Sequence, residues 1–369
     1  MKKVGIITFH ASHNYGSMLQ AYALQQVVLS LGHECEIINF RTDIQKKIYS
    51  PFFMYKGWLK KLKAIRYPRL AIDDIRKYRK FEKFLRQQYI LSSKTYSTAE
   101  ELKLADLDYN CYISGSDQIW NTTSGDFNFA YFLDFVRKGK RIAYAASMGP
   151  APSMHLSLKK SLFPYIREYV SKYDSVFVRE KDTAAMLEDI VGIKPEIVLD
   201  PTLLLNPQDW SALAGDKPLV SGDYILAYTP RYDDYKQLFV DAMKIAERHN
   251  LKVICTIPDN ISRWRRNPRF EYYTATGPIE FLNLVKYSKY VFCKSFHAVV
   301  FSIIFCKPFF AYEGMMDSRI SPLLKIAGLE YCADTPNKQL FIYDSDEVWI
   351  KFESDIHRSI QLLKNAING

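Results

Sequence analysis

The chain has 369 residues, of which 48% are hydrophobic and 24% are charged. This composition excludes a disordered protein, and the length allows two or three domains of ordinary size. The net charge is +10, but the segment from Lys56 to Arg86 holds twelve lysines and arginines against three acidic residues. The basicity therefore belongs to one segment, which argues against a nucleic-acid partner.

The cysteine pattern and the lengths of the apolar runs indicate a cellular compartment. The six cysteines form no CxxC pair, so a zinc site has no support and we expect reduced, buried thiols. No apolar run approaches the roughly 20 residues that cross a bilayer, and Val4–Phe9 is too short for a signal peptide. We expect a cytoplasmic protein, a candidate peripheral protein on the inner face of the cell membrane.

The first half of the chain alternates apolar runs of strand length with runs of helical spacing. It opens with a predicted strand at Val4–Thr8, a helix from Met18 to Leu31 and a strand at Glu36–Phe40, without a GxGxxG dinucleotide motif. Further strands are predicted at 108–114, 141–146, 175–178 and 197–199, and further helices at 156–172 and 182–190.

Residues 42–97 depart from this alternation and include the basic segment. Aromatic and aliphatic residues are interleaved with the cations, which predicts one or two amphipathic helices interrupted near Pro68. One interpretation is a solvated helical excursion that packs on the sheet. The other is that Lys56–Arg86 contacts anionic lipid head groups or a lipid-linked phosphate substrate.

The second half repeats the strand and helix alternation after a segment rich in proline and glycine, 206–222, which we expect to link two domains. Strands are predicted at 224–229, 252–257, 290–293 and 309–312, and helices at 233–249, 278–287, 298–305, 318–328 and 344–367. The predicted fold class is α/β, with two Rossmann-like domains facing a cleft. Their predicted bounds are 1–205 and 223–343, and the final helix, 344–369, can pack back on the first domain.

One strand–turn–helix–strand unit, Tyr290 to Tyr312, carries a candidate ligand site. Its turn places Ser295 and His297 at the carboxyl end of a strand and the start of a helix. Ligands of open α/β sheets bind at such ends, and a helix start favours an anion. We therefore predict a site for the anionic end of a small substrate. The alternative is that Ser295 only caps the helix and His297 is a surface histidine.

Other polar loops follow strands of the first domain. These are His10–Ser17, Gly115–Asn121 and Val178–Glu180. Arg179 and Arg319 could join His297 in binding a ligand with a carboxylate and a phosphate, because the arginine fork makes bidentate bonds to both groups. Taken singly, Arg179 could instead form a salt bridge, and Arg319 could be an ordinary surface residue.

Six motifs occur in a fixed order along nearly the whole chain outside the basic segment. They are NYGSMLQAYALQ (Asn14–Gln25), ISGSDQIWN (Ile113–Asn121), VRE (Val178–Glu180), DPTLLL (Asp200–Leu205), GPIEFL (Gly277–Leu282) and SFHAVVFSIIFCKPF (Ser295–Phe309). Together they resemble the polysaccharide pyruvyl transferase family. The resemblance implies a glycosyltransferase-B-like fold. It also implies transfer of a pyruvyl group from phosphoenolpyruvate to a sugar, commonly as a ketal across two hydroxyls.

The resemblance also suggests roles for the residues named above. Phosphoenolpyruvate is the expected donor, with no further cofactor, and a sugar or lipid-linked oligosaccharide is the expected acceptor. The donor-binding candidates are Arg179, Ser295, His297 and Arg319. The acceptor-binding candidates are His13, Asn14, Tyr15, Gly16, Ser116 and Asp117. Four residues are candidates for the proton transfers, and the sequence does not choose among them: His297, Asp117, Glu180 and His13.

The sequence departs from the family at one motif. Members often have Thr-Asp before Ser-Phe-His and Gly after it, whereas this chain has Cys293, Lys294 and Ala298. The charge of the loop is thereby reversed, which could strengthen anion binding or mark a different donor or acceptor. No metal site is expected, because acidic residues do not cluster.

Two other functions remain open on the sequence. A glycosyltransferase using a nucleotide sugar would need the same two-domain cleft. A non-catalytic protein that binds anionic glycans or a membrane surface would need only the basic segment.

Overall fold

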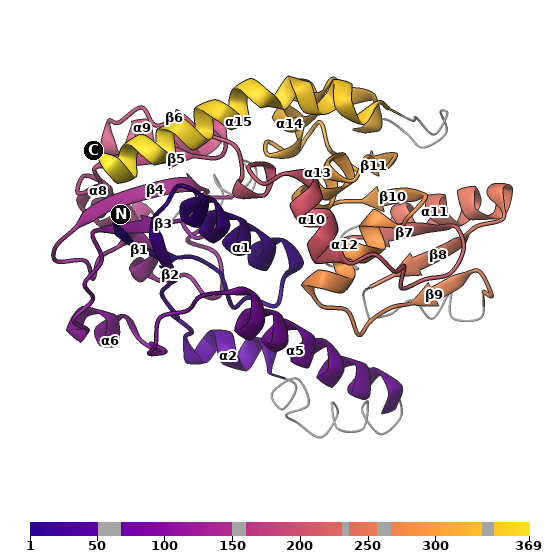
Figure 1. Cartoon of the computed structure of the whole chain (residues 1–369), viewed down its shortest axis with the longest axis horizontal. Coiled ribbons are helices and arrows are strands. Elements are labelled where there is room, and N and C mark those ends of the chain that lie inside the picture. Colours follow the sequence, from indigo (N-terminus) through magenta and orange to yellow (C-terminus); the bar gives the residue numbers. More distant parts are fainter. Residues whose placement is uncertain (51–67, 150–159, 231–235, 257–266, 334–342) are drawn as a thin grey trace.

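The computed structural model describes residues 1–50, 68–149, 160–230, 236–256, 267–333 and 343–369 (Figure 1). Over this part of the chain, the first domain contains a six-stranded parallel sheet in the order β2-β1-β3-β4-β5-β6. Its strands are β1 (Lys3–Ile7), β2 (Glu34–Ile37), β3 (Cys111–Ser114), β4 (Lys140–Ala146), β5 (Ser175–Val178) and β6 (Glu196–Ile197). Its helices are α1 (Tyr15–Ser30), α2 (Asp43–Tyr49), α5 (Pro68–Gln88), α6 (Ala99–Leu104), α8 (Phe163–Val170) and α9 (Lys181–Val191).

The second domain contains a parallel sheet of five strands, counted over the described residues, in the order β11-β10-β7-β8-β9. Its strands are β7 (Tyr224–Tyr228), β8 (Lys252–Cys255), β9 (Phe270–Tyr272), β10 (Tyr290–Cys293) and β11 (Phe309–Ala311). The helices of this half are α10 (Pro207–Ala214), α11 (Lys236–His249), α12 (Pro278–Lys286), α13 (Phe296–Ile304), α14 (Ile320–Ala327) and α15 (Ser345–Asn368). Short 3-10 turns lie at 129–132, 160–162, 201–203 and 330–333.

The central strands have short apolar sequences because helices cover both faces of a parallel sheet. All residues of β3 and β7 are buried, and the register pairs Ile6 with Ile113 and Leu226 with Val291. Runs of this kind can be recognised in the sequence, and each predicted strand overlaps an observed one. The prediction of a two-domain α/β fold is confirmed.

Other elements differ from the prediction. The segment 206–222 lies in the chain between the strands of the two sheets and contains α10, which starts with Pro207 in its first turn. Strand β9 lies where no strand was predicted, and Phe270 pairs with Val253 of β8. The helix predicted at 298–305 begins earlier, at Phe296. The helix predicted at 156–172 is observed from Phe163 to Val170, and residues 150–159 lie outside the described part.

The basic segment, 56–86, is described only from residue 68 onward, and its remaining part, 56–67, lies outside the described residues. From Pro68 the chain forms one helix, α5, whose apolar face buries Phe81, Phe84 and Leu85. A second helix, α2, begins after Thr42, whose hydroxyl accepts a hydrogen bond from the Gln45 N–H at 3.1 Å. Within the described residues, every helix is too short or too polar to cross a bilayer.

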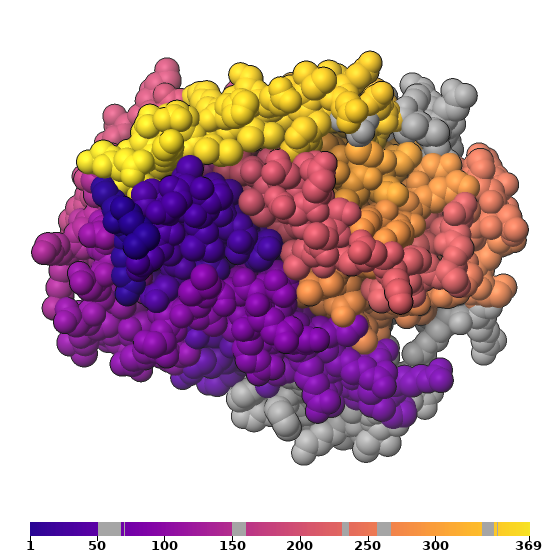
Figure 2. Space-filling model, viewed as in Figure 1, coloured from indigo at the N-terminus to yellow at the C-terminus, as the bar shows by residue number. Residues whose placement is uncertain are grey.

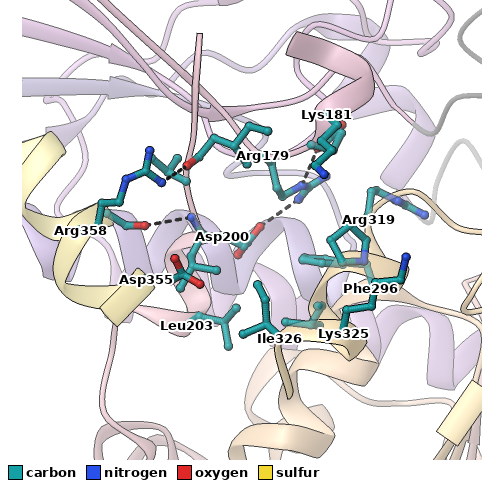
Figure 3. A pocket seen from close by; sticks show the side chains of 17 residues that line it. Arg179, Lys181, Asp200, Leu203, Phe296, Arg319, Lys325, Ile326, Asp355 and Arg358 are labelled. Atoms are coloured by element: carbon teal, nitrogen blue, oxygen red, sulfur yellow. Dashed lines mark hydrogen bonds and ion pairs between the residues drawn. The ribbon is translucent and has the colours of Figure 1, made fainter. Parts of the chain in front are cut away.

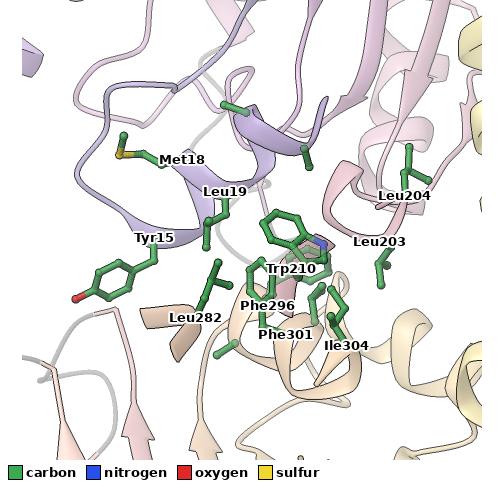
Figure 4. Close-up of a cluster of buried hydrophobic side chains, with 14 of the residues drawn as sticks. Tyr15, Met18, Leu19, Leu203, Leu204, Trp210, Leu282, Phe296, Phe301 and Ile304 are labelled. Atoms are coloured by element: carbon green, nitrogen blue, oxygen red, sulfur yellow. The ribbon is translucent and has the colours of Figure 1, made fainter. Parts of the chain in front are cut away.

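An apolar core continues from one domain to the other (Figure 4). Trp210 of α10 lies at its centre, fully buried, and its Nε1 donates a hydrogen bond to the Thr202 carbonyl at 3.0 Å. Its ring meets Phe301 of α13 edge-on at 4.9 Å. This core holds the second domain against the first behind the cleft.

Two helices also connect the domains at the surface. Helix α5 reaches the second domain through Lys80, which pairs with Glu280 at 2.9 Å. Helix α15 starts at the second domain and runs back across the first (Figure 1). There the Leu199 N–H donates to Ser359 at 3.1 Å, and the Lys2 ammonium donates to the Ile367 carbonyl at 2.6 Å. The two sheets are therefore fixed relative to each other on both sides of the core.

We expect Trp210→Ala to lower the free energy of unfolding by about 3–5 kcal/mol, because it leaves a large cavity in the shared core. Chemical denaturation of the native chain and the variant measures this difference. Leu104→Ala, at a side chain that is 81% exposed, is the control and should change stability by less than about 0.5 kcal/mol. Equal effects of the two variants would contradict the assignment of Trp210 to the core.

Candidate functional site

A cavity of about 590 Å³, here called the cleft cavity, lies between the two domains. Loops after β1, β3, β7, β10 and β11 form its walls, so it lies at the carboxyl ends of both sheets, where ligands of such folds bind. Its lining residues include Ser12, Asn14, Ser17, Tyr49, Asp117, Asn121, Ser124, Asp126, Lys294, Ser295, Phe296, His297, Asp317 and Arg319.

One end of the cleft cavity combines a helix start with two ion pairs. Ser295 precedes α13 and makes no side-chain cap, so the first turn of this helix presents its N–H groups without a capping side chain. Lys294 pairs with Glu313 at 2.6 Å, and the Arg319 guanidinium makes two hydrogen bonds to Asp317, at 3.0 and 2.6 Å. Burial alone would raise the pKa of Asp317, but the contact with Arg319 outweighs this and lowers it.

The other end of the cleft cavity is polar and lies on the first domain. Asp117, at the end of β3, has φ of 75° and accepts a hydrogen bond from the Ser17 hydroxyl at 2.6 Å. The hydroxyl of Ser124 and the carboxylate of Asp126 lie next to each other at 2.5 Å. Tyr49 adds an aromatic ring beside these groups. Hydroxyls, carboxylates and an aromatic face are the groups that bind a sugar.

A buried ionic cluster lies behind the cavity and joins the domains. The Asp200 carboxylate accepts a hydrogen bond from Arg179 Nη1 at 2.9 Å and lies 3.7 Å from His297 Nε2. Burial alone would raise the pKa of Asp200, but His297 and Arg179 outweigh this and hold it below its usual range. The Arg179 guanidinium also lies over the Phe296 ring, 4.8 Å from its centroid. Arg179 thus forms a salt bridge, which was the alternative to ligand binding that the sequence left open.

This cluster does not satisfy every hydrogen-bond donor of the Arg179 guanidinium. Its Nη2 is buried without a hydrogen-bond partner and lies 3.8 Å from Asp117, which lines the cleft cavity. His297 Nε2 also lacks a hydrogen-bond partner. Unsatisfied buried donors are costly, so such atoms mark places where a ligand can bind.

Glu180 lies away from the cleft cavity. Its carboxylate accepts hydrogen bonds from Ser147, from Thr183 at 3.1 Å and from Arg179 Nε at 3.3 Å. Burial raises the pKa of Glu180. The structure therefore brings His297 and Asp117 to the cavity wall and places Glu180 against Arg179.

The first loop divides its predicted acceptor residues between two places. His13 stacks on Phe81 and contacts Glu82 at 3.2 Å, and burial lowers its pKa. It lines a smaller cavity of about 120 Å³, together with Asn14 and Tyr15. Of these three, Asn14 alone also lines the cleft cavity, and its side chain caps α1 by accepting from the Gly16 N–H at 2.9 Å.

Three predicted site residues have close neighbours that explain their identity. The Tyr15 hydroxyl bonds to Thr276 of the second domain, and its ring stacks on Phe281 at 4.6 Å. Gly16 packs against the His297 ring, so a β-carbon at this position would collide with the imidazole. Ser116 is fully buried, and its hydroxyl donates to Asp200 at 3.3 Å, so it does not line the cleft cavity.

Sequence reasoning missed part of the site. Tyr49, Ser124 and Asp126 carried no motif, and only the tertiary structure brings them to the cavity. Ser17 lay inside a recognised motif but received no role. Asp317 could have been found from its position, two residues before Arg319, where an acid can orient the arginine.

The sequence matches the polysaccharide pyruvyl transferase family over residues 14–313. The chain belongs to this family. It is an α/β transferase with a glycosyltransferase-B-type arrangement of two domains. No curated protein sequence matches the chain.

Solved structures support the fold of this pyruvyl transferase family member. The UDP-GlcNAc 2-epimerase of Methanocaldococcus jannaschii, in complex with UDP-GlcNAc and UDP, has a TM-score of 0.53 and 12% identity and covers 94% of this chain and 98% of its own. The S. aureus MnaA–UDP structure has a TM-score of 0.50 and 12% identity, covering 99% and 91%. At this identity the likeness concerns the fold alone.

The loops that carry the family motifs meet around one centre. Asn14–Gln25 supplies Ser17, Ile113–Asn121 supplies Asp117, and Ser295–Phe309 supplies His297. Arg179 and Asp200, from two further motifs, form the cluster behind them. Within the described residues, no group of three or more His, Cys, Asp or Glu side chains has the arrangement of a metal site.

The buried histidine His10, in the loop after β1, should make the free energy of unfolding depend on pH. It is fully buried against Asn39, and burial lowers its pKa to about 4. The unfolded chain therefore takes up a proton near pH 6.5 that the folded chain does not. We expect the free energy of unfolding to fall by about 3 kcal/mol as the pH drops from 6.5 towards 4.

Chemical denaturation between pH 7 and pH 4.5 tests this expectation. His10→Gln should show a shallower loss of stability with falling pH than the native chain. His249→Gln, at an exposed position, should keep the native slope. If the His10→Gln variant loses stability with falling pH as steeply as the native chain does, groups other than His10 cause the acid sensitivity.

Proposed function

We propose that this enzyme transfers a pyruvyl group from phosphoenolpyruvate to a sugar of a surface polysaccharide or of its lipid-linked precursor. One observation carries the proposal. A single cavity has the uncapped start of α13, with Lys294 and Arg319 beside it, at one end and Asp117 at the other, in a member of the pyruvyl transferase family. Phosphoenolpyruvate has two anionic groups and the acceptor has hydroxyls, which matches the two ends.

The donor would bind at the second-domain end. Its phosphate fits the start of α13, where Ser295 and the first N–H groups lie beside Lys294. Asp317 occupies the Nε and Nη2 side of the Arg319 guanidinium, so the donor carboxylate would bind on its Nη1 side. Arg179 does not line the cleft cavity, but its Nη2, which has no hydrogen-bond partner, lies 3.8 Å from Asp117, which does line it. These groups are positioned before the ligand binds, which reduces the entropy lost on binding.

The chemistry requires proton transfers at two places. A general acid protonates the methylene carbon of phosphoenolpyruvate while a sugar hydroxyl adds to the central carbon and loses its proton to a base. The carbon–oxygen bond to phosphate then breaks and phosphate leaves. The second hydroxyl adds to the same carbon and closes the ketal, and its proton passes to the departing phosphate. We assign His297 as the acid and Asp117 as the base, because both line the cavity at opposite ends.

The remaining candidates receive supporting roles in this proposal. Glu180 and Asp200 position Arg179 and His297, because they contact those side chains and do not line the cleft cavity. Asn14 and Ser17 lie on the acceptor side. Tyr15 and Gly16 fix the start of α1 against the second domain, and His13 packs beside it.

Thermal unfolding in the presence of phosphoenolpyruvate tests the donor assignment. The native chain should be stabilised by about 2.7 kcal/mol when the ligand is at 100 times its dissociation constant. His297→Ala and Arg319→Met should lose most of this shift, because each removes an anion contact. Gly16→Ala should also reduce it, since the added β-carbon displaces the His297 ring. Arg248→Met, at an exposed position on α11, is the matched control and should keep the native shift.

A nucleotide sugar is the competing donor. If UDP-GlcNAc stabilises the protein and phosphoenolpyruvate does not, the proposed function would be glycosyl transfer and not pyruvyl transfer. Absence of stabilisation by both ligands would favour a non-catalytic protein that binds anionic glycans or membranes.

The described part of the basic segment supports contact with an anionic membrane surface. Along α5 the exposed cations are Arg69, Arg76, Arg79, Lys83 and Arg86. Their three- and four-residue spacing places most of them on one face of the helix. Ile72 and Ile75 are also exposed, at 47% and 40%. Figure 2 shows α5 along one edge of the molecule, reaching from the first domain to the second. We infer that this face docks the enzyme on anionic lipid.

Sedimentation with vesicles tests the docking surface. The native chain should bind phosphatidylglycerol vesicles and not phosphatidylcholine vesicles. Arg76→Glu/Arg79→Glu/Lys83→Glu should weaken this binding by about 100-fold or more, because each surface cation contributes about 1 kcal/mol. The control Lys194→Glu/Arg248→Glu/Lys364→Glu makes the same change in net charge at exposed positions elsewhere. If both triple variants weaken vesicle binding equally, the binding depends on the net charge of the protein and not on this face of α5.

A further inference from the structure

A second cavity, of about 410 Å³, has Phe296 in its wall, as the cleft cavity does (Figure 3). We call it the α14–α15 cavity. It is bounded by the start of α9, the chain after β6, and the facing sides of α14 and α15. Phe296 and Arg319 line both cavities, so the two share one wall. Its volume lies in the range of small-molecule sites, roughly 300–1,000 Å³.

The walls of the α14–α15 cavity are mostly apolar. They come from both domains: Ile197, Val198, Leu199 and Leu203 from the first, and Phe296, Pro322, Leu323 and Ile326 from the second. Figure 3 shows Leu203 and Ile326 facing each other across its floor. An apolar ligand body would therefore exclude water from both domains at once.

Several cations surround this apolar space. Lys181 and Lys325 are exposed at its edge, and within the described residues neither forms an ion pair. Arg319 and Arg358 also line it, paired with Asp317 and Glu196 respectively. The two lysines are therefore the cations that an incoming anion can contact without breaking an existing pair.

One helix start adds to the positive potential. Helix α9 begins at Lys181, and Glu180 before it makes no side-chain cap. This start lies at the cavity wall, and the N–H groups of an uncapped first turn attract anions. At the start of α14 the N–H groups of Ile320 and Ser321 already donate to the Asp317 carbonyl, at 3.1 and 2.9 Å.

The carboxylates at this cavity do not cancel its positive potential. Asp200 is held by Arg179 and accepts a hydrogen bond from the Thr202 hydroxyl at 2.7 Å. Glu180 is hydrogen-bonded to Ser147 and Thr183. Asp355 lies on the Arg358 side, away from Lys181 (Figure 3). The region between the α9 start and Lys325 therefore favours an anion.

We propose that the α14–α15 cavity binds a small amphipathic anion, an organic phosphate whose apolar body lies between Leu203 and Ile326 and whose head group contacts Lys181 and Lys325. The site is separate from the donor and acceptor ends of the cleft cavity, and the proposal does not depend on pyruvyl transfer. Because the ligand would contact both domains, its binding would stabilise their present arrangement.

Isothermal titration of the full chain tests this site with three probes: phenyl phosphate, farnesyl phosphate and inorganic phosphate. Phenyl or farnesyl phosphate should bind at least about tenfold more tightly than inorganic phosphate, because the apolar body is buried. Preference for phenyl phosphate would indicate a soluble aryl or nucleoside-like ligand, and preference for farnesyl phosphate would indicate a prenyl lipid.

Lys181→Glu/Lys325→Glu should weaken binding of the preferred probe at least about tenfold, because a hydrogen bond to a charged group contributes roughly 1.5–3 kcal/mol. The matched control, Lys194→Glu/Lys364→Glu, should bind like the native chain. Saturating phosphoenolpyruvate should not displace the probe, and the Lys181→Glu/Lys325→Glu variant should keep its stabilisation by phosphoenolpyruvate.

Three results would overturn the proposal: no preference for a phosphate with an apolar body, equal binding by the two double variants, or displacement by phosphoenolpyruvate. These results are distinct from a failure of the donor assignment. That failure would appear as the absence of stabilisation by phosphoenolpyruvate, whatever the three probes do.

Discussion

The contact between the Asp200 carboxylate and its two cationic neighbours holds the candidate site together. Arg179 comes from the end of β5 and His297 from the first turn of α13, so one buried acid joins the two domains. Burying charges is costly unless they are paired and hydrogen-bonded. Here Ser116 and Thr202 supply further hydrogen bonds to the same carboxylate. The cluster therefore tolerates little displacement, and it keeps His297 at the wall of the cleft cavity.

Much of the fold could be predicted because parallel strands covered on both faces have short apolar sequences. The strands at Val4–Thr8, Ser175–Val178 and Tyr290–Cys293 were found in this way. Helix α10 was missed because its proline and glycine residues are typical of a linker. In fact Pro207 begins the helix and Gly215 ends it, at φ of 83°. Strand β9 was missed because three residues are too few to show a periodic pattern.

The candidate site was predictable at the level of loops and not of side chains. Topology alone requires the loops after β1, β3, β5 and β10 to meet at the carboxyl ends of the sheets. It does not show that Ser116 faces inward to Asp200 while Asp117, the next residue, faces the cavity. It also cannot show that Tyr49, from residues 42–97, reaches the cleft cavity. Such assignments depend on rotamers and on packing between segments far apart in sequence.

The close packing of the His297 ring on Gly16 ties the imidazole to the relative placement of the two domains. The ring belongs to the second domain and the glycine to the first, so any rotation that widened the cleft would separate them. The same rotation would take His297 away from Asp200. Both contacts therefore require the arrangement of the domains that the shared core, α5 and α15 maintain. The imidazole is held beside Asp200 only in that arrangement.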